Sequence, residues 1–253
     1  MSADAVVHIY FLRHSESCSN VLGSAASAAL TYEDPELTTR GHAMAAERAE
    51  EFFRREAGRF GGGARHGEIY ICSTPLLRAQ QTAQHFAGGG WVDYDEIIVL
   101  PYIKNAELSE SDRARLAVSA EGPARLNYDL VPATGSGPAD VKEFFAWLGG
   151  QMKAGHTRLL FVLHKGFLRQ LTGWLLGAGQ AIEYGNLDGV EIEVHYGVDG
   201  KMKGLPRIVG EPVRRYRPSR SVPRDACAGG DAGCRIDVCR LRGGKTRKNR
   251  SRK

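Results

Sequence analysis

Apolar runs of this sequence end directly in side chains that bind anions or attack electrophilic centres. Residues 6–12 continue into Arg13 and His14, and residues 158–163 continue into His164. A guanidinium binds a phosphate through two parallel hydrogen bonds, and a neutral imidazole offers a nucleophilic nitrogen. These residue types indicate chemistry on an anionic, phosphate-like group.

A third run, residues 68–72, leads through Ser73 and Pro75 to Arg78. Pro75 stands at a favourable first-turn position of a helix predicted to reach residue 86. Ligands of open α/β sheets bind beyond the carboxyl ends of the strands, so neighbouring strands would bring two guanidiniums and two imidazoles into one crevice. No buried carboxylate is evident beside them, and an anionic ligand is expected to offset their repulsion.

The elements that must position these groups alternate along the chain. The expected strands are residues 6–12, 68–72, 96–100, 158–163 and 190–196, and the expected helices follow residue 41, begin at residue 75, cover residues 141–152 and follow residue 166. This alternation predicts an α/β fold with three layers, α/β/α, and a mostly parallel central sheet. Residues 190–196 alternate between apolar and polar, which predicts an antiparallel edge strand.

Positive charge is concentrated at the end of the chain. The 253 residues carry a net charge of +5, but residues 207–253 hold 15 Lys and Arg against 4 Asp and Glu, whereas residues 1–206 hold 19 against 25. We predict one folded domain over residues 1–205 and a basic tail without regular structure over residues 206–253. Truncation at Pro206 is then expected to leave the chemistry unchanged.

The sequence predicts a soluble protein. No run approaches the ~20 apolar residues of a membrane span, and the first apolar run lacks the features of a secretory signal. An intracellular, cytoplasmic location is expected, with a nuclear one left open by the basic tail. Neither a disulfide framework in the folded domain nor a zinc site among the tail cysteines, Cys227, Cys234 and Cys239, is expected.

Four segments, in order, resemble motifs of the histidine phosphatase superfamily, the clan that includes the phosphoglycerate mutases. Residues 11–20 resemble its RHG motif with the trailing ExxxN, residues 34–41 its DPxLTxxG segment, residues 73–83 its SPLxRAxQTA segment, and residues 162–166 its second histidine. The resemblance covers roughly residues 6–200 and implies a phosphoglycerate mutase-like fold.

The resemblance also implies phosphoryl transfer through a phosphohistidine on His14. Arg13, Arg78 and His164 would hold the phosphoryl oxygens, so that neither a metal ion nor another cofactor is required. Glu107 is expected to protonate the leaving oxygen, with Glu110 as the alternative.

Further residues near these motifs are given expected roles. Asn20 and Ser15 are expected to bind the substrate, Ser15 by bonding a phosphate oxygen from the position where the family has glycine. Glu16 is expected to stabilise the loop or a helix start. Lys165 stands where glycine is common, and either adds positive charge to the pocket or faces solvent. His42, His66 and His85 are interpreted as surface residues.

We therefore expect a metal-independent phosphomonoester hydrolase acting on a phosphorylated small molecule or a phosphoprotein. The LNERHYG-type segment of the cofactor-dependent mutases is absent, which favours hydrolysis over a phosphoglycerate-type phosphomutase. A third alternative is a non-catalytic protein that binds a phosphorylated ligand while its basic tail contacts nucleic acid weakly. Residues 245–253 contain six cationic side chains, a composition typical of nucleic-acid or nuclear-localisation patches.

Overall fold

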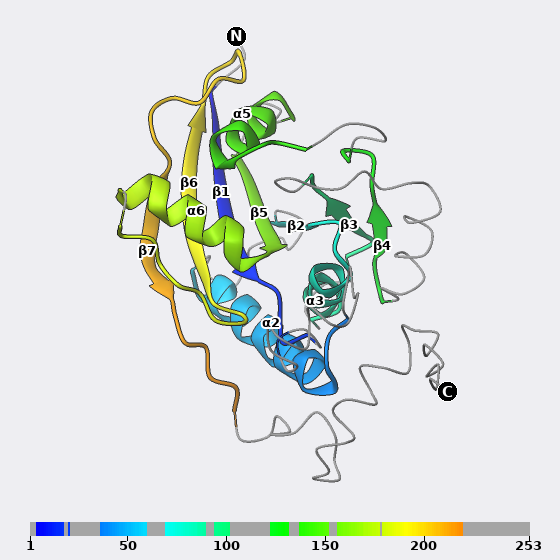
Figure 1. The fold of residues 1–253 in the computed structure, drawn as a ribbon. Helices are drawn as coiled ribbons and strands as arrows, with labels where there is room; N and C mark the ends of the chain where they lie inside the picture. Colours follow the sequence, from blue (N-terminus) through cyan, green and yellow to red (C-terminus); the bar gives the residue numbers. More distant parts are fainter. Residues whose placement is uncertain are drawn as a thin grey trace, which may run out of the picture.

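A single seven-stranded sheet with helices on both faces forms the described part of the protein (Figure 1). The computed structural model describes residues 4–17, 20, 36–59, 69–89, 94–101, 122–131, 137–151, 156–177 and 179–219. The strands are β1 (Ala5–Arg13), β2 (Ile69–Ser73), β3 (Glu96–Val99), β4 (Arg125–Asn127), β5 (His156–Leu163), β6 (Gly189–Tyr196) and β7 (Arg207–Val213). The helices are α2 (Thr39–Arg59), α3 (Leu77–Ala87), α5 (Val141–Gln151) and α6 (Lys165–Leu176).

The strand order, β4-β3-β2-β5-β1-β6-β7, places β1 and β5 side by side near the middle of the sheet. Every pairing from β4 to β1 is parallel, and only the pairings of β6 with β1 and β7 are antiparallel. The predicted three-layer α/β/α fold with a mostly parallel sheet is confirmed. The carboxyl ends of β1, β2 and β5 consequently lie at one edge of the sheet.

The sequence prediction for the end of the chain was wrong in two respects. β6 is antiparallel as predicted, but β7 pairs with its outer side, so β6 is not at the edge. The predicted unstructured tail begins in fact with this strand, and contacts continue to Ser219. Gly210, whose φ is +70°, and Pro212 interrupt the alternation that marks a strand, and both are tolerated because β7 is itself an edge strand. Residues 220–253 lie outside the described residues.

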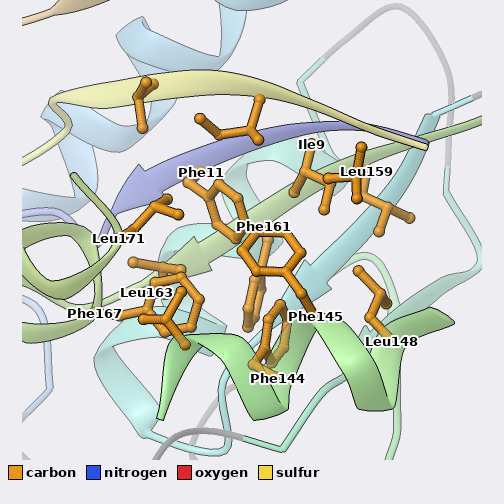
Figure 2. Close-up of a cluster of buried hydrophobic side chains, with 14 of the residues drawn as sticks. Ile9, Phe11, Phe144, Phe145, Leu148, Leu159, Phe161, Leu163, Phe167 and Leu171 are labelled. Atoms are coloured by element: carbon orange, nitrogen blue, oxygen red, sulfur yellow. The ribbon is translucent and has the colours of Figure 1, made fainter. Parts of the chain in front are cut away.

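Aromatic rings fill the space between the sheet and helices α5 and α6 (Figure 2). Phe11 of β1 lies 5.3 Å from Phe167 of α6 between ring centroids, and Phe144 of α5 lies 5.6 Å from Phe161 of β5. Aromatic pairs at such distances add about 0.5–1.5 kcal/mol to the effect of burial alone. Because Phe167 lies in the first turn of α6, this packing fixes the start of that helix, and with it His164.

On the opposite face, α2 and α3 cover a second apolar cluster. Tyr10 and Leu12 of β1 point to this side, where Phe52 and Phe86 pack against them. Arg48 of α2 is only 1% exposed, and its guanidinium donates a 2.7 Å hydrogen bond to the hydroxyl of Tyr10. The two clusters together hold β1, which ends at the candidate site, from both faces.

None of the helices in the described ranges has the length and apolar character needed to cross a membrane. Cys72 is a buried free thiol whose pKa is raised by burial. The prediction for the three tail cysteines concerns residues outside the described ranges.

Candidate active site

The carboxyl ends of β1, β2 and β5 bring the predicted site residues together. The backbone N–H of His14 donates to the carbonyl of Leu163 over 2.9 Å, and that of Thr74 donates to Val162 over 3.1 Å. The ring centroids of His14 and His164 are 5.1 Å apart. The expected convergence of imidazoles and guanidiniums is therefore observed, and it follows from parallel pairing of the three strands.

His14 is held as a neutral imidazole with a defined tautomer. The Nδ1 atom lies 2.7 Å from the carbonyl oxygen of Ser15, and since a carbonyl only accepts, Nδ1 carries the proton. The lone pair is then on Nε2, toward which Nε of Arg78 donates over 3.3 Å. Burial, followed by the positive charges of Arg78 and Arg13, lowers the pKa of His14 well below its ordinary value.

His164 faces the same space from the end of β5. It is 7% exposed, and its Nε2 shares a 2.9 Å hydrogen bond with the hydroxyl of Thr74. Burial lowers its pKa well below the ordinary value, and His14, Arg78 and Arg13 add to the effect. Because the pKa values of both imidazoles are lowered beside two guanidiniums, the site favours an anionic ligand.

Arg13 is supported from behind by the turn that precedes β6. Its NH1 group donates to the carbonyl of Tyr184 over 2.8 Å. Burial lowers the pKa of Arg13, whereas the negative charge of Asp188 opposes this change. Asp188 is 1% exposed, so the sequence-based statement that no buried carboxylate is evident here was wrong. A single aspartate before a strand gave no signal of this role.

Ser15 has a different role from the one predicted. Its side chain is fully buried, and the hydroxyl donates to the carbonyl of Gly41 over 2.7 Å, so this donor is not offered to a phosphate oxygen. The backbone N–H of Ser15 donates to the hydroxyl of Thr82 in α3. Ser15 thus ties the loop after β1 to both α2 and α3.

Asn20, predicted to bind substrate, is exposed and bonded within the loop. Its Oδ1 accepts hydrogen bonds from the backbone of Ser17 over 3.0 Å and from the side chain of Asn186 over 3.1 Å. Asn186 also donates to the carbonyls of His14 and Ser15. Sequence reasoning missed Asn186, which fixes the backbone that carries the candidate nucleophile.

The prediction that Glu16 stabilises the loop or a helix start is confirmed. Its carboxylate accepts hydrogen bonds from the hydroxyl of Thr38 over 2.9 Å and from Arg40 over 2.6 Å. Thr38 in turn caps α2 by accepting the N–H of Gly41 over 2.9 Å. A side chain at residue 41 would place its Cβ 2.0 Å from the carbonyl oxygen of Glu16, so only glycine allows this approach.

The comparison with protein families agrees with this geometry. The family model of the histidine phosphatase superfamily, branch 1, matches residues 9–189. The chain belongs to this superfamily. A comparison with curated protein sequences finds no match.

Two solved structures match most of the chain with low sequence identity. The protein histidine phosphatase SixA complexed with tungstate is 16% identical, with a TM-score of 0.43, and the match covers 79% of this chain and 96% of that one. A phosphoglycerate mutase from Bacillus anthracis str. Sterne is 14% identical, with a TM-score of 0.44, covering 79% and 92%.

The geometry addresses neither the predicted general acid nor the surface interpretation of His66, which lies outside the described residues. Glu107 and Glu110 both lie outside the described residues. No cluster of three or more His, Cys, Asp or Glu side chains suited to a metal ion occurs among the residues that the structure describes.

Lys165 lies at the rim of the site in an ion pair. Its Nζ is 2.5 Å from Glu183, and Arg169 lies 3.6 Å from the same carboxylate. The hydrogen bond from Lys165 is the main cause that lowers the pKa of Glu183. The charge of Glu183 also acts on Arg13. Of the two alternatives for Lys165, the structure favours the solvent-facing one, because its side chain is half-exposed and Glu183 offsets its charge.

Replacing Glu183 by glutamine should strengthen anion binding. The substitution removes a negative charge that attracts Lys165, Arg169 and Arg13, so the KM for a phosphate ester should fall about two- to fivefold at low ionic strength and less at high salt. Glu50→Gln, at an exposed carboxylate that pairs with Arg54 on α2, provides the control and should leave KM unchanged. An unchanged KM in Glu183→Gln would contradict the conclusion that the charge of Glu183 weakens anion binding.

Two histidines interpreted as surface residues form a half-buried pair. Nδ1 of His42 in α2 lies 2.9 Å from Nε2 of His85 in α3. Burial, followed by the charge of His42, lowers the pKa of His85 from 6.5 to about 4. The surface interpretation was wrong because α2 packs directly on α3.

Acidification should destabilise the protein through His85. Below pH 6.5 the unfolded chain binds a proton at this residue and the folded chain does not, until the pH approaches 4. Between pH 7 and pH 5 this difference removes about 2 kcal/mol from the free energy of unfolding. Urea unfolding at both pH values should show a smaller loss in His85→Gln than in the wild type. Equal losses would contradict the prediction.

Proposed function

We propose that this protein is a metal-independent phosphomonoester hydrolase that works through a phosphohistidine on His14. The observation that carries the proposal is the state of His14: a buried, neutral imidazole with its proton on Nδ1 and its Nε2 lone pair beside Arg78. Membership of a superfamily of phosphatases and mutases supports phosphoryl transfer as the general chemistry.

In the first step, Nε2 of His14 attacks phosphorus and the bond from phosphorus to the ester oxygen breaks. The ester oxygen leaves with a proton from a carboxylic acid, for which Glu107 is the first choice and Glu110 the second. The positive charge that develops on the imidazole is stabilised by the Nδ1 hydrogen bond to Ser15. Arg13, Arg78 and His164 surround the phosphoryl oxygens and stabilise their charge.

In the second step, water attacks the phosphohistidine and the phosphorus–nitrogen bond breaks. The carboxylate takes the proton from the water, and inorganic phosphate leaves. His14 returns to its neutral form, which its lowered pKa favours at neutral pH.

Turnover of p-nitrophenyl phosphate in EDTA tests the proposal. The wild type should release p-nitrophenol and inorganic phosphate in equal amounts. A phosphomutase would instead move the phosphoryl group to a second hydroxyl of a phosphorylated sugar acid without releasing phosphate. Absence of phosphate release from a panel of phosphorylated sugars, nucleotides and peptides would refute hydrolysis. Transfer of the phosphoryl group between hydroxyls would then favour a phosphomutase, and absence of any transfer would favour a binding protein.

A further inference from the structure

The segment that follows β7 contacts the turn that precedes β6, and this turn contacts Arg13 of the candidate site. We call residues 214–219 the strap and residues 184–188 the support turn. The backbone N–H of Tyr216 in the strap donates a 2.7 Å hydrogen bond to Oδ1 of Asp188 in the support turn. The other oxygen, Oδ2, accepts the N–H of Gly185 over 2.6 Å. The buried carboxylate therefore joins the strap to the support turn.

The support turn holds Arg13 through three hydrogen bonds. The carbonyl of Tyr184 accepts from the guanidinium over 2.8 Å. The N–H of Arg13 donates to the carbonyl of Asp188 over 2.9 Å, and the N–H of Leu187 donates to the carbonyl of Arg13 over 3.2 Å. Leu187 has a φ of +60°, an unfavourable conformation for leucine that the surrounding contacts must maintain.

The strap is anchored at its other end to α2. Glu47 accepts hydrogen bonds from the hydroxyl of Tyr216 and from the backbone N–H of Ser219, each over 2.8 Å. The buried guanidinium of Arg48 lies 5.5 Å from the centre of the Tyr216 ring. Partial burial tends to raise the pKa of Glu47, but the hydrogen bonds from Ser219 and Tyr216 lower it overall. The carboxylate is thus charged when it holds the strap.

We infer that the strap is a positioning device for Arg13: by holding Asp188 and the support turn against β1, it fixes the guanidinium that the proposed reaction uses. Asp188 and Tyr216 are positioning residues, since each acts through Arg13. The inference rests on the proposed function for its kinetic consequence, but not for its effect on anion binding. It also replaces the expectation that truncation at Pro206 leaves the chemistry intact, because that truncation removes β7 and the strap.

Replacement of Tyr216 by alanine tests the inference in the full-length chain. Loss of the ring and of its hydrogen bond to Glu47 should release the strap and lower kcat/KM about tenfold, since small displacements of a binding group are costly in catalysis. The matched control is Tyr94→Ala, because Tyr94 is a partly buried tyrosine that packs on the same apolar cluster, at the other end of the sheet. The control should lose thermal stability and retain activity.

A double-mutant cycle distinguishes positioning from general destabilisation. In an Arg13→Lys background, Tyr216→Ala should change kcat/KM by less than about twofold, because the guanidinium that the strap positions is already gone. A tenfold loss in both backgrounds, or full activity of Tyr216→Ala alone, would overturn the inference.

Binding of inorganic phosphate, measured by calorimetry, separates this inference from the proposed function. Tyr216→Ala should weaken phosphate binding in the wild-type background and not in the Arg13→Lys background, even if no ester is hydrolysed. Equal phosphate affinity of wild type and Tyr216→Ala would refute the strap's role whether or not the protein is a hydrolase.

Discussion

Substitution of His14 by asparagine should lower kcat for p-nitrophenyl phosphate by at least about 10⁴-fold, the scale at which enzymes lose turnover when the nucleophile is removed. The amide nitrogen of asparagine can replace Nδ1 as the donor to Ser15, so the buried hydrogen bond is retained. Only Nε2, the proposed nucleophile, has no counterpart. The substitution therefore tests chemistry more than folding.

Trapping of the intermediate gives this prediction a second measurement. Wild-type protein quenched during turnover of a labelled ester should carry an acid-labile, base-stable phosphoryl group, as expected for a phosphorus–nitrogen bond, and His14→Asn should carry none. His195→Asn, at a half-exposed histidine on β6, is the matched control and should behave as the wild type. Undiminished turnover by His14→Asn would refute nucleophilic catalysis by this residue.

The central part of the site could be predicted because it follows from a few regular features. The apolar runs that end at Arg13 and at His164 are neighbouring parallel strands, and parallel strands share the edge at which their carboxyl ends lie. Arg78 reaches the same edge because α3 begins just after β2. Strand pattern and helix start were sufficient to place these groups.

The groups that support the site could not be predicted in the same way. Asp188 and Asn186 act on Arg13 and His14 only because β6 pairs with β1, which brings residues more than 170 positions apart into contact. Nothing in their local sequence marks that contact. For Ser15 the sequence suggested a role that the structure does not support. Its position in a motif predicted contact with the substrate, whereas its hydroxyl donates a hydrogen bond to the carbonyl of Gly41.

The end of the domain was misplaced because edge strands carry weak sequence signals. β7 contains Gly210 and Pro212 and leaves half of its backbone groups outside the sheet pairing, so it resembles a loop. It forms a strand because it pairs with the outer edge of β6. The strap depends in turn on β7, which brings Tyr216 to Asp188.

Substitution of Arg78 by glutamine should reduce kcat/KM by about 10²–10³-fold and also change its pH dependence. The proposed reaction requires neutral His14, so activity should be lost as the pH falls through the pKa of that residue. In the wild type this acid limb should lie well below pH 6.5, since burial and the charges of Arg78 and Arg13 lower the pKa of His14. Removal of one of these charges raises the pKa, and the acid limb should move to higher pH.

The lysine variant separates charge from geometry at the same position. Arg78→Lys keeps a positive charge near His14 but lacks the planar guanidinium that binds two phosphoryl oxygens at once. Its kcat/KM should fall as well, while its acid limb stays closer to that of the wild type than to that of Arg78→Gln. If both variants shift the acid limb equally, the hydrogen bond from the guanidinium, and not its charge, is what keeps His14 neutral. If neither variant shifts it, burial and the charge of Arg13 must account for the lowered pKa of His14.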